Sequence, residues 1–202
     1  MKVMIAGIGG ASLGTEIYKS LQLAGGYEVF GCDISSRAYG LYEPGFVKTY
    51  RLDRENYVDN VISACADAGT KWLIPGGEQP MVLLGGATEK LAEAGIELVA
   101  NTTEVIALFS DKDETFKKLA DNAIAIPRTG AVKRPEDLDA VGLPCIVKPA
   151  TGSGGSVSVF FAVTVEEAMI YAEFIRRNGA QPIAQEYIDL QEGEFTIGVL
   201  SL

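Results

Sequence analysis

The 202-residue chain has a net charge of −10, with 48% hydrophobic and 22% charged residues. This composition is typical of a globular protein with a buried core, and the excess of acids argues against a nucleic-acid partner. The chain has no histidine, which excludes a Ser-His or Cys-His catalytic pair and a His-ligated metal within it. Its apolar runs are far shorter than a membrane span and no secretory leader is visible, so we expect a cytoplasmic protein without a membrane partner.

Residues 1–100 alternate between short apolar runs and helical patterns. The apolar runs predict strands at 2–6, 27–33, 46–52, 71–77 and 97–100, and the helical spacing predicts helices at 13–23, 55–67 and 81–94. Such an alternation is typical of a parallel sheet with helices on both faces. We therefore expect a Rossmann-like α/β domain over residues 1–110.

After residue 100 the pattern changes to two short helices followed by β-rich runs that Pro and Gly separate. The runs predict strands of a mostly antiparallel sheet at 128–132, 145–150, 157–163, 181–188 and 194–202. Thr164 with Glu167 forms the sequence signature of a capping box, which predicts a helix over 164–177. We expect residues 111–202 to form a separate α+β domain.

Two features of the first domain resemble a dinucleotide site. The stretch GIGGASLG, from Gly7 to Gly14, follows the first strand, and Asp33 ends the second. The third glycine is displaced from the GxGxxG spacing, however, and Asp33 also fits an acid that caps the next turn. We favour the turn, because no nicotinamide-side chemistry follows. An NAD(P)-binding protein that uses Gly7, Gly9, Gly14 and Asp33 remains the alternative.

A second glycine-rich stretch, IVKPATGSGGSVSV, covers residues 146–159. Lys148 lies on the preceding strand, and the loop contains Gly152, Ser153, Gly154, Gly155 and Ser156. Glycines allow backbone N–H groups to turn toward phosphate oxygens, and serines add hydroxyl donors. The loop joins two strands, so it predicts a hairpin flap and not a helix-capping P-loop. Taken alone, it fits an ordinary mobile hairpin equally well.

The order of short motifs in the second domain resembles the ATP-grasp superfamily, in particular ligases related to the large chain of carbamoyl-phosphate synthase. The motifs are SDK at 110–112, IPRT at 126–129, VKP at 147–149 and QEYIDLQEGEF at 185–195. The resemblance implies a pre-ATP-grasp domain at 1–110 and an ATP-grasp lid subdomain at 111–202. It also implies that the C-terminal part of the ATP-grasp fold is missing, so that these residues are the N-terminal part of a longer ligase.

The resemblance also implies an ATP site. Lys112 matches the first phosphate-binding basic residue, and Lys148 matches the lysine that reaches the α-phosphate and the adenine edge. The flap over the β- and γ-phosphates would be Gly152, Ser153, Gly154, Gly155 and Ser156. The backbone of Glu186 and Ile188 would pair with adenine, and Glu194 would hold the ribose hydroxyls. Lys112, Glu186 and Glu194 also fit ordinary surface charges.

Glu78 follows the fourth strand, at the edge where parallel sheets bind ligands. In the resembling ligases this loop borders the acceptor pocket, which makes Glu78 a candidate substrate residue. The family's magnesium ligands should lie downstream of Glu194, so we assign no metal ligand and no catalytic residue. Magnesium is expected only in the full-length protein, and this chain alone is expected to be inactive.

The implied reaction is ATP-dependent ligation of a small carboxylate, or bicarbonate, with a small amine through an acyl phosphate. A non-catalytic nucleotide-binding protein is a further alternative. The apolar strand FTIGVLSL at the C-terminus would form an exposed sheet edge, and a homodimer is one arrangement that would cover it.

Overall fold

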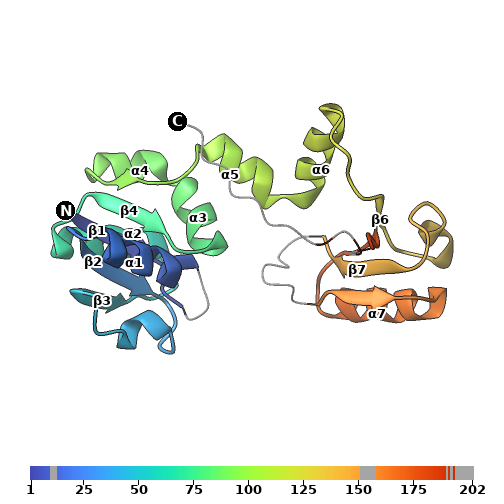
Figure 1. Ribbon diagram of the computed structural model, residues 1–202, viewed down its shortest axis with the longest axis horizontal. Coiled ribbons are helices and arrows are strands. Elements are labelled where there is room, and N and C mark those ends of the chain that lie inside the picture. Colours follow the sequence, from blue (N-terminus) through green and yellow to red (C-terminus); the bar gives the residue numbers. More distant parts are fainter. Residues whose placement is uncertain (10–12, 151–157, 190, 192, 194–202) are drawn as a thin grey trace. The chain divides into compact units, whose positions relative to one another are not determined.

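The computed structural model describes residues 1–9, 13–150, 158–189, 191 and 193. The chain divides into two compact units, Met1–Ser110 and Asp111–Leu202, and each has its own sheet (Figure 1). In the described part of the chain, no helix is both long and apolar enough to cross a membrane.

The first unit is built on a parallel five-stranded sheet, in the order β3-β2-β1-β4-β5. Its strands are β1 (Lys2–Ala6), β2 (Glu28–Asp33), β3 (Lys48–Arg51), β4 (Trp72–Pro75) and β5 (Glu97–Leu98). Its helices are α1 (Leu13–Ala24), α2 (Tyr57–Ala68), α3 (Glu78–Gly85), α4 (Thr88–Glu93) and α5 (Thr103–Ser110), with a 3-10 turn at Tyr39–Tyr42. The predicted α/β fold with a parallel sheet is confirmed.

Helices cover both faces of this sheet because its strands alternate buried side chains between the two faces. Met4 and Phe30 pack with Leu84 and other residues of α2, α3 and α4 on one face. Ile5 and Val29 pack with side chains of α1 on the other. The single helix predicted at 81–94 is instead the pair α3 and α4, since consecutive glycines at its middle have low helix propensity.

The second unit is built on an antiparallel sheet, as predicted, and its strand order is β6-β9-β7-β8. Its strands are β6 (Thr129–Ala131), β7 (Cys145–Pro149), β8 (Phe160–Ala162) and β9 (Pro182–Glu186). Its helices are α6 (Lys112–Asp121) and α7 (Val165–Arg177), with a 3-10 turn at Pro135–Leu138. The strand expected at 194–202 lies outside the described residues.

Helix α7 packs on one face of the antiparallel sheet and supplies its core. Ala168, Ala172 and Ile175 of α7 lie against Val147 and other buried residues of the strands. The predicted capping box at the start of α7 is confirmed: Glu167 donates its N–H to Thr164 Oγ1 at 3.1 Å, and its carboxylate accepts from Thr164 N at 3.2 Å. This fixes where the helix begins against the sheet.

Three glycines bring the end of β1, the start of α1 and the loop after β4 into backbone contact. Gly14 donates its N–H to the Gly76 carbonyl at 2.9 Å. A Cβ atom on Gly14 would lie 1.9 Å from the Gly7 oxygen, and one on Gly76 would lie 2.0 Å from that same oxygen. The glycines are therefore required by packing of the backbone at the junction of the two strands.

A single added methyl group tests this packing. Gly14→Ala should lower the free energy of unfolding by about 3 kcal/mol, because the methyl group overpacks a backbone contact. Gly9→Ala is the matched control before α1, since among the described residues its Cβ would meet only Asp33 Oδ2, at 3.9 Å. Urea unfolding of both variants measures the difference, and equal stabilities would contradict the proposed role of the contact.

Candidate functional site

The Asp33 carboxylate accepts hydrogen bonds from backbone N–H groups after β1 and after β2. One carboxylate oxygen accepts the Ile8 N–H at 2.8 Å and the other accepts the Ser35 N–H at 2.8 Å. The residue is only 9% exposed. A ribose diol would have to compete with both donors, so the structure favours the turn-capping interpretation of Asp33 over the dinucleotide site.

Glu78 is the first residue of α3 and follows Gly76 and Gly77 at the carboxyl end of β4. The residue is exposed at this edge of the parallel sheet. Parallel sheets bind ligands at this edge, where the strand order reverses around β1 and β4. The position suits contact with a small substrate.

In the second unit, a row of polar side chains crosses three strands on the face opposite α7. Lys148 Nζ on β7 donates to Gln185 Oε1 on β9 at 2.6 Å. Gln185 Nε2 donates to Thr129 Oγ1 on β6 at 3.2 Å, and that hydroxyl donates to the Pro127 carbonyl at 3.0 Å. The Lys148 ammonium is thus held by a chain of hydrogen bonds and does not extend freely from its strand.

Apolar side chains lie beside this row. Ile146 pairs in register with both Gln185 and Phe161, so all three lie on the same face. Phe161 and Tyr187 meet edge to face with ring centroids 4.9 Å apart. The face opposite α7, which we call the Lys148 face (Thr129, Ile146, Lys148, Phe161, Gln185 and Tyr187), combines a cation with half-exposed aromatic surface. This combination suits a ligand with an apolar ring and an anionic end.

Arg128 and Glu186 form an ion pair where β9 ends. The guanidinium donates from Nη2 to Glu186 Oε1 at 2.9 Å, and the Arg128 backbone N–H donates to Oε2 at 3.1 Å. These bonds lower the pKa of the Glu186 carboxyl from its ordinary value, and they raise the pKa of the guanidinium. The carboxylate is therefore held close to the strand, and only the backbone of Glu186 remains for a ligand in the predicted adenine contact.

The structure brings some of the predicted site residues together and does not describe others. Lys148, Glu186 and Ile188 lie on or directly after the neighbouring strands β7 and β9. Helix α6 begins at Lys112, but the side chain of Lys112 is not described. The predicted flap residues Gly152, Ser153, Gly154, Gly155 and Ser156, together with Glu194, lie outside the described residues.

Sequence reasoning missed Gln185, Thr129 and Arg128. Gln185 lies directly before Glu186 in the QEYI motif, and Thr129 follows Arg128 in IPRT. Both motifs were recognised, but the register that places β6 beside β9 was needed to pair their side chains. Within the described ranges, no cluster of three or more His, Cys, Asp or Glu side chains could hold a metal ion.

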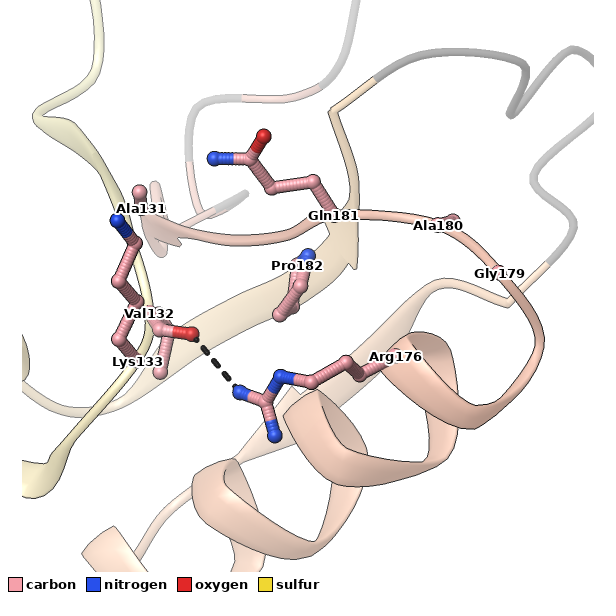
Figure 2. Close-up of a pocket in the computed structure, with 8 residues that line it drawn as sticks. All are labelled: Ala131, Val132, Lys133, Arg176, Gly179, Ala180, Gln181 and Pro182. Atoms are coloured by element: carbon pink, nitrogen blue, oxygen red, sulfur yellow. Dashed lines mark hydrogen bonds between the residues drawn. The ribbon is translucent and has the colours of Figure 1, made fainter.

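A cavity of about 340 Å³ lies away from the Lys148 face, near the C-terminal end of α7. Figure 2 shows Arg176 reaching from α7 toward the Val132 carbonyl, to which it donates at 3.3 Å. The guanidinium also pairs with Glu173. Lys133, Gln181 and Pro182 line the cavity, and it shares no residue with the Lys148 face.

Residues 109–200 match the family model of the ATP-grasp domain.

Among relatives, the carbamoyl phosphate synthase large chain of Vibrio cholerae is 34% identical over 70 residues, which are 33% of this chain and 6% of that protein. The solved L-amino acid ligase from Bacillus licheniformis aligns with a TM-score of 0.70 at 17% identity, covering 93% of this chain and 44% of its own. The biotin carboxylase domain of the Hydrogenobacter thermophilus 2-oxoglutarate carboxylase, solved with MgADP and bicarbonate, aligns with a TM-score of 0.66 at 15% identity over 93% of this chain and 44% of its own. The chain therefore spans less than half of these structures, and at such identities they show the fold.

The ion pair between Arg128 and Glu186 predicts a specific acid sensitivity. Because the pKa of Glu186 is lowered in the native state, its contribution to stability is fully present above the ordinary value of 4.5 and is lost as the pH falls through the lowered pKa. Glu186→Gln should therefore be less stable than the wild type near neutral pH, and the two should converge in acid.

Urea unfolding at a series of pH values measures this difference. Arg128→Gln removes the other partner of the pair and should give the same convergence. A constant difference between the wild type and Glu186→Gln down to pH of about 2 would show that the ion pair does not stabilise the native state.

Proposed function

We propose that the chain is the nucleotide-binding part of an ATP-dependent ligase of the carboxylate–amine type. The observation that carries this proposal is the position of Lys148 beside the Gln185–Ile188 segment on neighbouring strands of an ATP-grasp domain. ATP has an aromatic base and a highly charged end, and the Lys148 face offers a surface of matching chemistry.

In this proposal the Lys148 ammonium offsets charge on the α-phosphate and borders the adenine. Its hydrogen bond to Gln185 fixes its direction, because Gln185 is itself held by Thr129. The backbone of Glu186 and Ile188 binds the adenine edge, and the neighbouring rings of Phe161 and Tyr187 supply apolar surface. A flat base that covers such rings gains from the removal of apolar surface from water.

The remaining roles follow from the resemblance to ATP-grasp ligases. Lys112 would bind phosphate, and the flap residues from Gly152 to Ser156 would cover the β- and γ-phosphates. Glu194 would accept hydrogen bonds from the ribose diol, a pairing that suits a carboxylate. Glu78, at the ligand-binding edge of the first unit, would contact the acceptor substrate.

The proposed reaction couples ATP to the formation of a carbon–nitrogen bond. A carboxylate, or bicarbonate, attacks the γ-phosphorus of ATP to give an acyl phosphate and ADP. The amine then attacks the acyl carbon, releasing phosphate and a proton. Both substrates are small molecules, and we place the reaction in the cytoplasm, with a homodimer as the proposed assembly.

Magnesium would neutralise charge that develops on the transferred phosphoryl group. The described residues do not offer a cluster of carboxylates that could hold it. We therefore assign no step of the reaction to a metal ligand of this chain, and we expect the 202 residues alone to bind nucleotide without turnover.

Nucleotide binding is tested by thermal unfolding of the 202-residue chain with a non-hydrolysable ATP analogue. At a ligand concentration one hundred times Kd, binding stabilises the native state by about 2.7 kcal/mol, which raises Tm by several degrees. Lys148→Ala should lose this shift, because the cation beside the phosphates is removed.

Lys133→Ala is the matched control, since it removes the same charge from the cavity near α7 and should keep the shift. A shift that survives in Lys148→Ala would contradict the site assignment. A Tm that rises with NAD and not with the ATP analogue would contradict the ligase proposal itself.

A further inference from the structure

The backbone hydrogen bonding between β6 and β9 becomes irregular at the last residue pair, Arg128 with Glu186. Hydrogen-bonded pairs in an antiparallel ladder alternate with non-hydrogen-bonded ones. Val132 donates its N–H to the Pro182 carbonyl at 3.1 Å, and Gly130 pairs in register with Ala184 two residues further along. The next hydrogen-bonded pair in this sequence is Arg128 with Glu186. In a regular ladder these two residues would exchange both of their backbone hydrogen bonds.

Only one of these two backbone bonds is made. Glu186 donates its N–H to the Arg128 carbonyl at 2.8 Å, as the ladder requires. The Arg128 N–H donates instead to Glu186 Oε2 at 3.1 Å, and the Arg128 guanidinium donates to Oε1 at 2.9 Å. The Glu186 carboxylate thus accepts a hydrogen bond from the Arg128 N–H, which in a regular ladder would donate to the Glu186 carbonyl. We call this pair of contacts the Arg128–Glu186 latch.

We propose that Arg128 is a positioning residue that presents the Glu186 carbonyl to the exocyclic amine of adenine and so selects a 6-amino purine over a 6-oxo purine. The proposal rests on the proposed function, in which the backbone of this segment binds the base. A 6-amino group donates a hydrogen bond to a carbonyl. A 6-oxo group is itself an acceptor and would face the carbonyl with like polarity.

The neighbouring residue holds the same strand end from the other face. Because side chains alternate along a strand, Gln185 points to the Lys148 face while Glu186 points away from it. Gln185 is bonded to Lys148 and to Thr129, which holds the strand just before Glu186. The Glu186 carbonyl lies in the next peptide group, between the Glu186 side chain held by Arg128 and the Tyr187 ring packed on Phe161. An acceptor that is fixed in this way discriminates better than one that rotates to suit either base, because its polarity cannot adapt.

The selection is tested with ATP and inosine triphosphate, which differ at position 6 of the purine. We expect the wild type to bind ATP more tightly than inosine triphosphate. In Arg128→Gln the ratio of the two Kd values should fall about fivefold, the size expected for one hydrogen bond. Arg177→Gln removes the same charge from an exposed ion pair on α7 and should leave the ratio unchanged.

A latch that only stabilises the sheet would weaken both nucleotides equally, and an unchanged ratio in Arg128→Gln would overturn the proposed selection. A second measurement does not depend on nucleotide: the titration of the Glu186 carboxyl, followed by ¹³C NMR. Its pKa should lie below the ordinary value in the wild type and should rise in Arg128→Gln. An unchanged Glu186 pKa would show that the latch does not form in solution.

The two measurements separate this proposal from the proposed function. If the wild type binds neither nucleotide, the nucleotide-binding function is wrong and the selection falls with it, while the titration still decides whether the latch exists. If the wild type binds ATP and loses it in Lys148→Ala, the function stands, and the ratio in Arg128→Gln alone decides the role of Arg128.

Discussion

Strand β9 lies between β6 and β7 and is hydrogen-bonded to both. Its two-residue alternation places Gln185 on the Lys148 face and Glu186 on the opposite side. A shift of one residue in its pairing would exchange the two, turning Glu186 toward Lys148 and Gln185 toward Arg128. The lysine contact, the Arg128–Glu186 latch and the proposed adenine edge therefore all depend on this single register. Ala184 of β9, packed against α7, fixes this register, because a shift of one residue would turn it away from the core.

The first unit depends on a comparable constraint in its backbone. The loops after β1 and β4 approach so closely that a side chain on Gly14 or Gly76 would collide with the Gly7 carbonyl. Asp33 then ties the loop to the end of β2 through two backbone donors. A sequence that resembles a phosphate-binding loop thus serves to join strands at the edge of a sheet. The residue types are shared with dinucleotide sites because both uses require backbone that approaches closely.

The sequence predicted the strands and helices well where local patterns were strong. The capping box of Thr164 and Glu167 marked the start of α7 because its donors and acceptors are three residues apart in the chain. The prediction of one helix at 81–94 was wrong. The helical spacing of apolar residues continues across the glycines, but the structure has two helices there, α3 and α4. For the site, the order of motifs predicted Lys148 and Glu186 through resemblance to a family. The predicted flap and Glu194 lie outside the described residues.

The sequence by itself determined the alternation of strands and helices, the change to an antiparallel pattern and the order of the ATP-grasp motifs. These properties follow from local spacing and from residue type along the chain. Only the tertiary structure decided which side chains meet: Lys148 with Gln185, and Arg128 with Glu186, 37 and 58 residues apart. Such contacts depend on strand order and register. Those are set by the burial of apolar side chains between sheet and helix, and so by interactions that no short stretch of the sequence contains.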